Sequence, residues 1–309
     1  MIRRLLTLLS ILIGVAIILG HLGFIHPALD SFAHFRLHLM ALLTLMGVIH
    51  CLSMQWTMSV LSLSVAVITS FNTADYLPSV TGQESHADTN TATVRLLQFN
   101  LRFDNPEYRR IAETIKGANA DFVVLQEVTF TTGKSLALLK DDYPYQLSCR
   151  FSSIGSVALL SRHPFVDNSK RHCVRQLGFA RAQFTIDGRE ISVASLHLHW
   201  PWPFRQHTQL DALMPDFEAM QAPLLLAGDF NATPWSHSVK RVSTATETDI
   251  AHGFAPSWLP PIAGHKLTQW LGLHIDNTLH SEEFVLRKRA TGAPTFSDHL
   301  PVLSVFEFK

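Results

Sequence analysis

The sequence has little charge and little cysteine. Only 16% of its 309 residues are Asp, Glu, Lys or Arg, against about 25% in an average soluble protein. Its 25 basic and 25 acidic residues cancel, so it lacks the basic excess of a protein that coats nucleic acid. With 47% apolar residues and three cysteines, it is neither a disordered chain nor a small domain held together by many disulfides.

The few charges are unevenly distributed along the chain. Residues 1–72 contain only four of them: Arg3, Arg4, Asp30 and Arg36. Residues 73–309 contain 22 basic and 24 acidic residues, a density typical of a compact enzyme domain. The sequence therefore predicts a membrane anchor over residues 1–74, followed by a domain of a different kind.

Three transmembrane helices are predicted in this anchor, at 5–24, 37–54 and 56–73. Leu5–Phe24 is an uncharged run of 20 residues, which is long enough to cross a hydrocarbon core about 30 Å thick. A secretory signal peptide would have a shorter apolar core and a small-residue cleavage site, whereas His26-Pro27 follows here. The second uncharged stretch runs from Leu37 to Ala74, which suits two short spans joined near Ser53–Trp56.

The basic residues predict the side on which the rest of the chain lies. Arg3 and Arg4 place the N-terminus inside by the positive-inside rule. Three crossings then place the catalytic domain outside, in the periplasm of a bacterium whose inner (cell) membrane carries the anchor. The alternative is one long span with a re-entrant segment, which gives two crossings and a cytoplasmic domain.

Beyond the anchor the pattern changes. Residues 75–93 are rich in Ser, Thr, Asn and Asp, which predicts a flexible linker. Residues 94–309 predict one α/β domain of two packed sheets or one open sheet. Helices are expected from Asn105-Pro106 onward and over 204–220. Strands are expected at 94–100, 121–128, 156–161, 181–186, 189–197, 223–230, 271–279, 283–289 and 301–308.

Polar side chains stand where the apolar strands end. They are Asn100, Glu127, His197, Asp229, Asn231, Asp276, and the group Ser297-Asp298-His299 before the last strand. Carboxylates are costly to bury without a partner, so several of them at strand ends indicate a site. Hard oxygen ligands with few imidazoles suit Mg²⁺, or Mn²⁺, and hence chemistry on a phosphate ester. The chain has no G-x-x-x-x-G-K-[ST] phosphate loop.

Seven segments together resemble the endonuclease/exonuclease/phosphatase (DNase I-like) family, over about residues 94–308. They are QFNLRFDNP (98–106), LQEV (125–128), LLSRHP (159–164), SLHLHWP (195–201), AGDFNATP (227–234), HIDNTL (274–279) and SDHLPV (297–302). The apolar N-terminus is similar to that of a membrane-anchored bacterial subgroup. The resemblance implies a four-layered α/β/β/α sandwich with its site at one mouth of the two sheets.

The resemblance also implies a role for each residue. Glu127 matches the main metal ligand, with Asn100 and Asp298 on the metal side. Asp229 matches the residue that orients or deprotonates the attacking water, and Asn231 the residue that holds this water and the phosphate. His197, Asp276 and His299 match residues at the scissile phosphate. Arg102 stands where some nucleases of the family have an acid, so it is a candidate phosphate contact, as is Arg181.

These features predict a membrane-tethered, Mg²⁺-dependent phosphoesterase that hydrolyses a phosphodiester or phosphomonoester, with a lipid-linked phosphodiester as the narrower expectation. A nuclease is the alternative within this class, and the near-neutral charge disfavours it because it provides no strong nucleic-acid surface. A non-catalytic binding or scaffold protein is the alternative of another class.

The remaining candidates have more ordinary interpretations. Two cysteines do not prove a bridge, and we expect Cys149 and Cys173 to be unpaired. Trp200-Pro201-Trp202-Pro203 predicts a packed loop, with a substrate groove or a membrane contact as alternatives. His252, His265 and His274 lack metal-ligand spacing and are expected at the surface.

Overall fold

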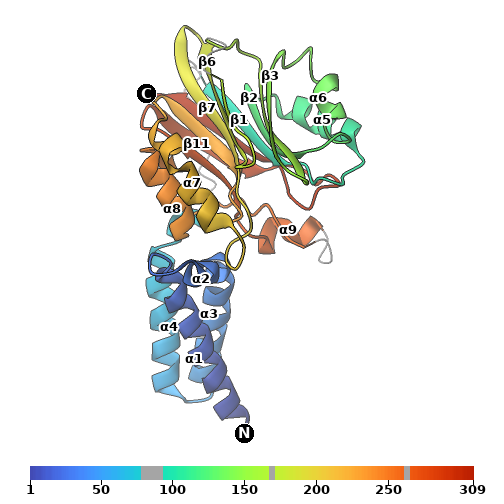
Figure 1. Ribbon diagram of the computed structural model, residues 1–309. Coiled ribbons are helices and arrows are strands. Elements are labelled where there is room, and N and C mark those ends of the chain that lie inside the picture. Colours follow the sequence, from blue (N-terminus) through green and yellow to red (C-terminus); the bar gives the residue numbers. More distant parts are fainter. Residues whose placement is uncertain (78–92, 167–170, 261–264) are drawn as a thin grey trace.

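The computed structural model describes residues 1–77, 93–166, 171–260 and 265–309. Within them, a bundle of N-terminal helices lies beneath an α/β domain (Figure 1). The predicted linker falls almost entirely outside the described residues. Its first residues contact the domain, because Gly253 N donates to Asp75 O (2.8 Å) and the Tyr76 ring packs edge-on against Trp235.

The bundle contains α1 (Ile2–His21), α3 (Arg36–Leu52) and α4 (Trp56–Phe71), and its N-terminus lies at the end far from the domain (Figure 1). The short α2 (Pro27–Asp30) and the 3-10 helix η1 (Ser31–Phe35) connect α1 to α3 beside the domain. Among the described residues, two segments are long and apolar enough to cross a membrane: Ile2–His21 and Pro27–Leu52. Helix α4 has 16 residues and is shorter, so the count of three spans stays a prediction.

The bundle contacts the domain through the segment that connects α1 and α3. The Asp30 carboxylate accepts hydrogen bonds from the backbone N–H groups of His237 (2.7 Å) and Ser238 (2.9 Å), at the N-terminus of α8 (His237–Ala245). This position suits an anion because the first N–H groups of a helix lack partners within the helix. Trp235 Nε1 donates to Ala33 O (2.7 Å) nearby. The helical bundle therefore contacts the domain directly.

In the part of the chain that the structure describes, twelve strands form two six-stranded sheets, with orders β11-β12-β1-β2-β4-β3 and β5-β6-β7-β8-β10-β9. The first sheet contains β1 (Thr93–Asn100), β2 (Phe122–Val128), β3 (Tyr145–Ser152), β4 (Gly155–Ser161), β11 (Phe284–Thr291) and β12 (Val302–Phe308). The second contains β5 (His172–Val174), β6 (Phe179–Ile186), β7 (Arg189–His197), β8 (Leu224–Asp229), β9 (Asp249–Ile250) and β10 (Asp276–His280).

The two sheets pack face to face, and helices cover both outer faces (Figure 1). One apolar core, with Val124 and Leu225 among its members, lies between the sheets. A second core packs α5 (Tyr108–Ala118) on the first sheet, next to α6 (Lys134–Leu138). A third packs α7 (Gln206–Glu218) and α8 on the second sheet. The four-layered sandwich is confirmed, and the open sheet is wrong.

Two predicted element boundaries need correction. Helix α5 begins at Tyr108, because the Asn105 side chain accepts from Glu107 N (2.9 Å) in a turn instead of capping a helix at 106. The predicted strand 271–279 begins only at Asp276. Leu271 ends a helix, α9 (His265–Leu271), that the apolar pattern did not distinguish from a strand.

The expectation that Cys149 and Cys173 are unpaired is wrong. They form a disulfide, with Cα atoms 5.5 Å apart. Cys149 lies on β3 and Cys173 on β5, which are edge strands of different sheets. The bridge therefore links the two layers at one edge of the sandwich. The spacing of 24 residues along the chain gave no sign of this proximity.

Candidate active site

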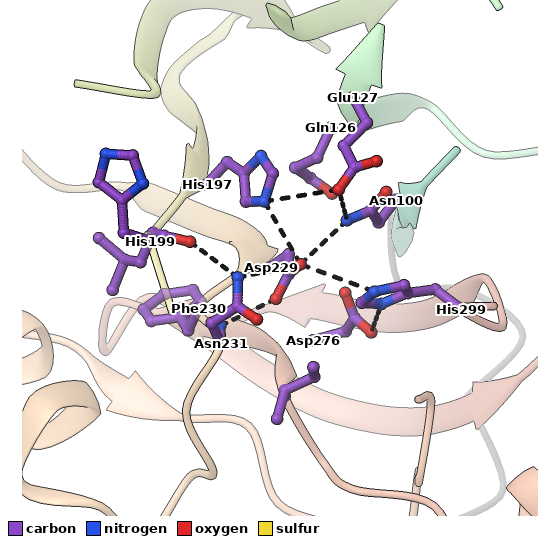
Figure 2. A network of polar contacts seen from close by, with 12 residues as sticks. Asn100, Gln126, Glu127, His197, His199, Asp229, Phe230, Asn231, Asp276 and His299 are labelled. Atoms are coloured by element: carbon purple, nitrogen blue, oxygen red, sulfur yellow. Dashed lines mark hydrogen bonds and ion pairs between the residues drawn. The ribbon is translucent and has the colours of Figure 1, made fainter. Parts of the chain in front are cut away.

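Strand pairing brings most of the predicted polar residues together (Figure 2). Asn100 at the end of β1 pairs with Gln126 of β2, the residue before Glu127. In the other sheet, His197 at the end of β7 is the register partner of Asp229 at the end of β8. Asp276, which begins β10, is the partner of Asp229 on its other side. Residues more than 170 positions apart in the chain thus meet at one mouth of the sandwich.

Backbone features beside these residues explain why particular amino acids precede them. A Cβ atom on Gly228 would collide with the backbone oxygen of Leu196, so the close approach of β7 and β8 needs a glycine just before Asp229. Glu127 has a left-handed backbone (φ 57°), and the pairing of β2 with β4 is irregular between Leu125 and Val128. Such backbone in a non-glycine residue near a strand end is characteristic of functional sites.

Asn100 connects the two sheets through its side-chain amide. Its Nδ2 donates to Asp229 Oδ2 (2.9 Å) and Glu127 Oε1 (3.2 Å), while its Oδ1 accepts from Arg102 N (3.0 Å). The other oxygen of Glu127 accepts from Phe103 N (2.6 Å). Burial, which disfavours the charged form, raises the pKa of Glu127 above its ordinary value. The hydrogen bonds thus offset only part of the cost of burying the charged Glu127 carboxylate.

Asp229 is buried at the centre of the cluster. Its Oδ1 accepts from Asn231 N (2.8 Å). Burial first, and then the neighbouring Asp276 charge, raise the pKa of Asp229 to about 7, although His299 and the hydrogen bonds oppose the shift. A carboxyl group with a pKa near neutrality is suited to accept a proton from water. Asn231 itself donates its side-chain amide to Leu198 O (2.8 Å).

The Asp276–His299 pair predicted from the sequence is present. His299 Nδ1 lies 2.7 Å from Asp276 Oδ2, and His299 Nε2 lies 3.7 Å from Asp229 Oδ2. Burial alone would lower the pKa of His299, but Asp276 and Asp229 raise it to about 10. The ring is therefore a cation at neutral pH, and its Nε2–H is available to an anionic group in the site.

His197 is held in the opposite state. Burial first, and then the positive His299, lower the pKa of His197 to about 3, so its ring is neutral. Its Nε2 lies 3.5 Å from Asp229 Oδ2 and 4.0 Å from Glu127 Oε1 (Figure 2). Its Nδ1 finds no hydrogen-bond partner among the described residues. The Phe151 ring packs against it, with centroids 5.0 Å apart.

The cluster opens into a small pocket of about 80 Å³. Asp298 lies on the rim of this pocket, where Trp258 Nε1 donates to its Oδ2 (3.1 Å). The lining residues are Glu127, Phe151, Ile154, His197, Leu198, His199, Trp200, Asp229, Asn231, Trp258, Asp298 and His299. A larger hollow of about 1250 Å³ beside α8 contains none of the predicted site residues.

The donor set fits a divalent cation at Glu127. Three carboxylates, those of Glu127, Asp229 and Asp298, line one pocket opposite a single cationic ring, so the site has an excess of negative charge. Hard oxygen donors of this kind suit Mg²⁺ or Mn²⁺. Atoms of Asp229, Asp276 and His299 also come within 4.8 Å of one another. We do not assign the metal to that group, because a His299 cation cannot be a ligand.

The two predicted arginines lie differently. Arg102 borders the site through its backbone N–H on Asn100, but its Nε donates to Asp104 (2.5 Å), a neighbour on the same loop. Arg181 lies away from the pocket, on the helix-covered side of β6, where its Nη1 donates to Ala219 O (2.8 Å). Of the two, the structure thus brings only Arg102 near the site.

Sequence reasoning missed three residues that support the site. Gln98 Nε2 donates to Asp276 Oδ1 (2.6 Å) and to Gln126 Oε1 (2.9 Å). Two glutamines within apolar strands were a usable signal, because buried amides need partners. His34, in η1, lies with its Nε2 3.1 Å from Asn231 O. Nothing in the sequence connects two residues that are 197 positions apart.

His274 also differs from expectation. It is buried, with its ring against those of Trp235 and Phe254, and burial lowers its pKa to about 3. The apolar pattern around HIDNTL could have indicated this. His252 is exposed as expected, and the side chain of His265 lies outside the described residues.

Comparison with known proteins identifies one family and one fold. The model of the Endonuclease/Exonuclease/phosphatase family matches residues 97–299. These residues include every predicted site residue. No sequence among the curated proteins matches the chain.

Several solved structures share the fold at low sequence identity. The endonuclease/exonuclease/phosphatase from Bacteroides vulgatus is 19% identical (TM-score 0.56), over 71% of this chain and all of the other. A beta toxin from Staphylococcus aureus with bound magnesium ions is 16% identical (TM-score 0.54), over 71% and 100%. Sphingomyelinase C from Streptomyces griseocarneus is 18% identical (TM-score 0.50), over 70% and 99%.

Proposed function

Because the chain belongs to the Endonuclease/Exonuclease/phosphatase family and is thus a hydrolase of phosphoric esters, we propose that it cleaves a phosphodiester or phosphomonoester with a divalent cation while anchored in a membrane. The observation that carries this proposal is the combination of Asp229, with its pKa near 7, and the His299 cation in one pocket. The two groups are a base and an anion-binding donor, respectively.

In this proposal each residue of the site has a separate role in the reaction. Asp229 accepts a proton from water, and the water oxygen then forms a bond to phosphorus. The ester P–O bond on the opposite side breaks, and the leaving oxygen takes up a proton. The His299 Nε2–H is a hydrogen-bond donor for the negative charge that grows on the phosphate oxygens, and the Asn231 amide joins it by giving up its hydrogen bond to Leu198 O. Asp276 holds His299 charged and fixes its ring through the 2.7 Å contact.

We assign the cation to Glu127, with Asp298 and Asn100 on the same side of the pocket. When bound, it supplies positive charge to the phosphate oxygens. Mg²⁺ is the preferred ion and Mn²⁺ the alternative, in keeping with the magnesium ions in the beta toxin structure. Asn100 would have to turn its amide oxygen toward the ion, because Nδ2 faces the two carboxylates here.

Three observations support a membrane-anchored enzyme with its domain outside the cell membrane. Two N-terminal segments are long and apolar enough to span. The N-terminus, with Arg3 and Arg4, lies at the end of the bundle far from the domain (Figure 1). The disulfide between Cys149 and Cys173 suits an oxidising compartment such as the periplasm.

We favour a lipid-linked phosphodiester over a nucleic acid. The acidic and basic residues balance, so the chain offers no strong surface for a polyanion. Sphingomyelinase C, which shares the fold, acts on a membrane lipid, as its name states. A nuclease is the second candidate, because the matched family includes nucleases.

The test is a substrate panel. The full chain in detergent is given bis-p-nitrophenyl phosphate, mixed phospholipids, single-stranded DNA and duplex DNA, each with Mg²⁺, Mn²⁺ or EDTA. We expect hydrolysis of the first two that EDTA abolishes and Mg²⁺ restores. Preferred cleavage of DNA would establish the nuclease instead, and no metal-dependent hydrolysis of any substrate would overturn the proposal.

A further inference from the structure

Two segments of the domain place large apolar side chains at its surface. One is the loop between β7 and α7, where Trp202 is 52% and Phe204 65% exposed; the other is α9, where Trp270 is 69% exposed. We call this set the apolar rim: Trp200, Trp202, Phe204, Leu267, Trp270 and Leu271. Exposed apolar groups gathered in this way commonly mark an interaction surface.

The apolar rim lies at the end of the helical bundle that faces the domain. Ser31 Oγ donates to Trp202 O (3.4 Å), and the His26 ring is 6.4 Å from that of Trp202. On the other segment, His38 Nε2 lies 2.8 Å from Leu271 O. His26 and Ser31 belong to the segment that links α1 to α3, and His38 lies in the first turn of α3, where the predicted spans end. In Figure 1 the β7–α7 loop and α9 both border the upper end of the bundle.

This position determines what surrounds the apolar rim. If α1 and α3 cross a bilayer, their ends beside the domain lie in the head-group region, and the rim lies at the same level. Tryptophan is enriched at this depth because its ring is apolar and its N–H is polar. The linking segment is itself apolar at its surface, with Phe24 65% and Phe35 53% exposed. The head-group region of the bilayer is therefore the partner that we expect to cover the apolar rim, because the proposed anchor lies in the same bilayer.

One member of the apolar rim, Trp200, also lines the active-site pocket. Trp200 lines the pocket next to Asn231 and His199, and it packs edge-on against Trp258, with ring centroids 5.5 Å apart. Trp258 in turn holds Asp298. One side of the pocket thus continues into the surface that faces the bundle end.

From this geometry we propose that the apolar rim dips into the head-group region of the bilayer that holds the anchor, so that the pocket takes the phosphodiester of a lipid from that same bilayer. The proposal rests on the proposed hydrolase function. It adds a membrane-contact surface and the source of the substrate. The pocket would then stay close to the bilayer surface, because residues 30–38 hold the domain against the bundle.

The contact is tested first without any reference to activity. The full chain, with Trp56→Phe to remove the tryptophan at the far end of the bundle, is reconstituted into bilayers that contain shallow brominated phospholipids. We expect bromine to quench the fluorescence, and the Trp202→Phe/Trp270→Phe pair to remove most of this quenching. Trp235→Phe is the matched control. Trp235 is only 4% exposed, so its loss should leave the quenched signal unchanged. Although the variant loses the hydrogen bond to Ala33 O, the Asp30 contacts with His237 and Ser238 still hold the domain against the bundle.

Equal quenching before and after the Trp202→Phe/Trp270→Phe change would overturn the proposal. The proposal would also be overturned if neither brominated lipid nor aqueous iodide quenched the tryptophans of the apolar rim. A second copy or another protein would then cover the rim.

A second experiment separates the rim from the chemistry. Phe204→Ser/Trp270→Ser should lower hydrolysis of phosphatidylglycerol and phosphatidylethanolamine in the reconstituted bilayer by about tenfold, because lost burial weakens the contact. Its rate on soluble bis-p-nitrophenyl phosphate should stay unchanged. Phe130→Ser is the control, since Phe130 is 87% exposed and contacts Lys134 at the start of α6, a helix that lies far from the bundle in Figure 1.

The outcomes distinguish the two proposals. Equal lipid rates for the double variant and the control, with hydrolysis of the soluble substrate intact, would overturn the membrane contact and leave the hydrolase standing. If the unsubstituted chain hydrolyses neither substrate, the hydrolase proposal fails, and the quenching experiment still decides the contact.

Discussion

His34 Nε2 lies 3.1 Å from the backbone oxygen of Asn231, so a side chain beside the N-terminal helical bundle hydrogen-bonds a residue of the candidate active site. His34 is buried, and its Nδ1 lies 3.0 Å from Ser31 O. Asn231 O also accepts from Gln206 Nε2 (3.2 Å). The N-terminal helices therefore help to hold the loop after β8 in place, in addition to the membrane anchoring that we propose for them.

This contact predicts that His34→Ala lowers kcat by about tenfold with little change in KM, because one buried hydrogen bond that fixes Asn231 is lost. His34→Gln, whose amide can also donate, should recover most of the rate. The measurement is steady-state hydrolysis of bis-p-nitrophenyl phosphate by the full chain. His21→Ala, an exposed histidine at the end of α1, is the control. A rate for His34→Ala equal to that of the control would show that the anchor does not position the site.

The metal assignment predicts that Glu127→Gln raises the Mg²⁺ concentration needed for half-maximal activity by at least about tenfold, since a neutral amide is a weaker ligand than a carboxylate. Metal titration of the rate measures this constant. Glu113→Gln, on the exposed side of α5, should leave it unchanged. If Glu127→Gln had an unaltered Mg²⁺ requirement, Glu127 would not be the main ligand, and the ion would bind elsewhere in the pocket.

The disulfide predicts a change in stability and not in chemistry. Cys149→Ser/Cys173→Ser should lower the free energy of unfolding by about 3 kcal/mol, because the closed loop of about 24 residues no longer restricts the unfolded chain. The hydrolysis rate per folded molecule should stay the same. Thermal unfolding in detergent, with and without reductant, measures the effect. If reductant lowers the melting temperature of the double variant as much as that of the original chain, reduction of the Cys149–Cys173 bridge is not the cause, and the prediction is contradicted.

The buried His274 predicts a loss of stability in acid. Its pKa is about 3 in the folded protein and about 6.5 in an unfolded chain, so the stability it contributes is complete above pH 6.5 and falls as the pH drops. Between pH 7.5 and pH 5 the loss is about 2 kcal/mol for this one residue. His274→Phe should therefore lose about 2 kcal/mol less than the original chain over this range. Urea unfolding in detergent at the two pH values measures it, and equal losses would contradict the assignment.

The sequence predicts most of the strands and most of the candidate site. Buried strands alternate with turn signals, so eight of the nine predicted strands appear near their predicted places, and the polar residues at strand ends mark the site. The predicted strand at 271–279 is confirmed only from Asp276. Leu271 ends α9, and Leu273 forms an isolated bridge with Trp258 outside the sheet, so an apolar run does not by itself show where a strand begins.

The contacts that depend on three-dimensional proximity could not be predicted in this way. The Cys149–Cys173 bridge joins edge strands of two different sheets, and the His34–Asn231 contact joins two parts of the chain that the sequence separates as anchor and domain. Both contacts depend on neighbours in space, which no local pattern encodes. The burial of His274 is different, because the apolar residues around it in HIDNTL could have indicated it.

The central claim is that Asp229 deprotonates water for the hydrolysis of a phosphate ester. The most direct measurement is the Mg²⁺-dependent rate on bis-p-nitrophenyl phosphate for Asp229→Asn beside Asp211→Asn, whose carboxylate is exposed and pairs with Arg241. We expect Asp229→Asn to lose about 10²- to 10⁴-fold in kcat while it stays folded, and Asp211→Asn to keep the original rate. Asp229→Asn with the rate of the original chain would contradict it.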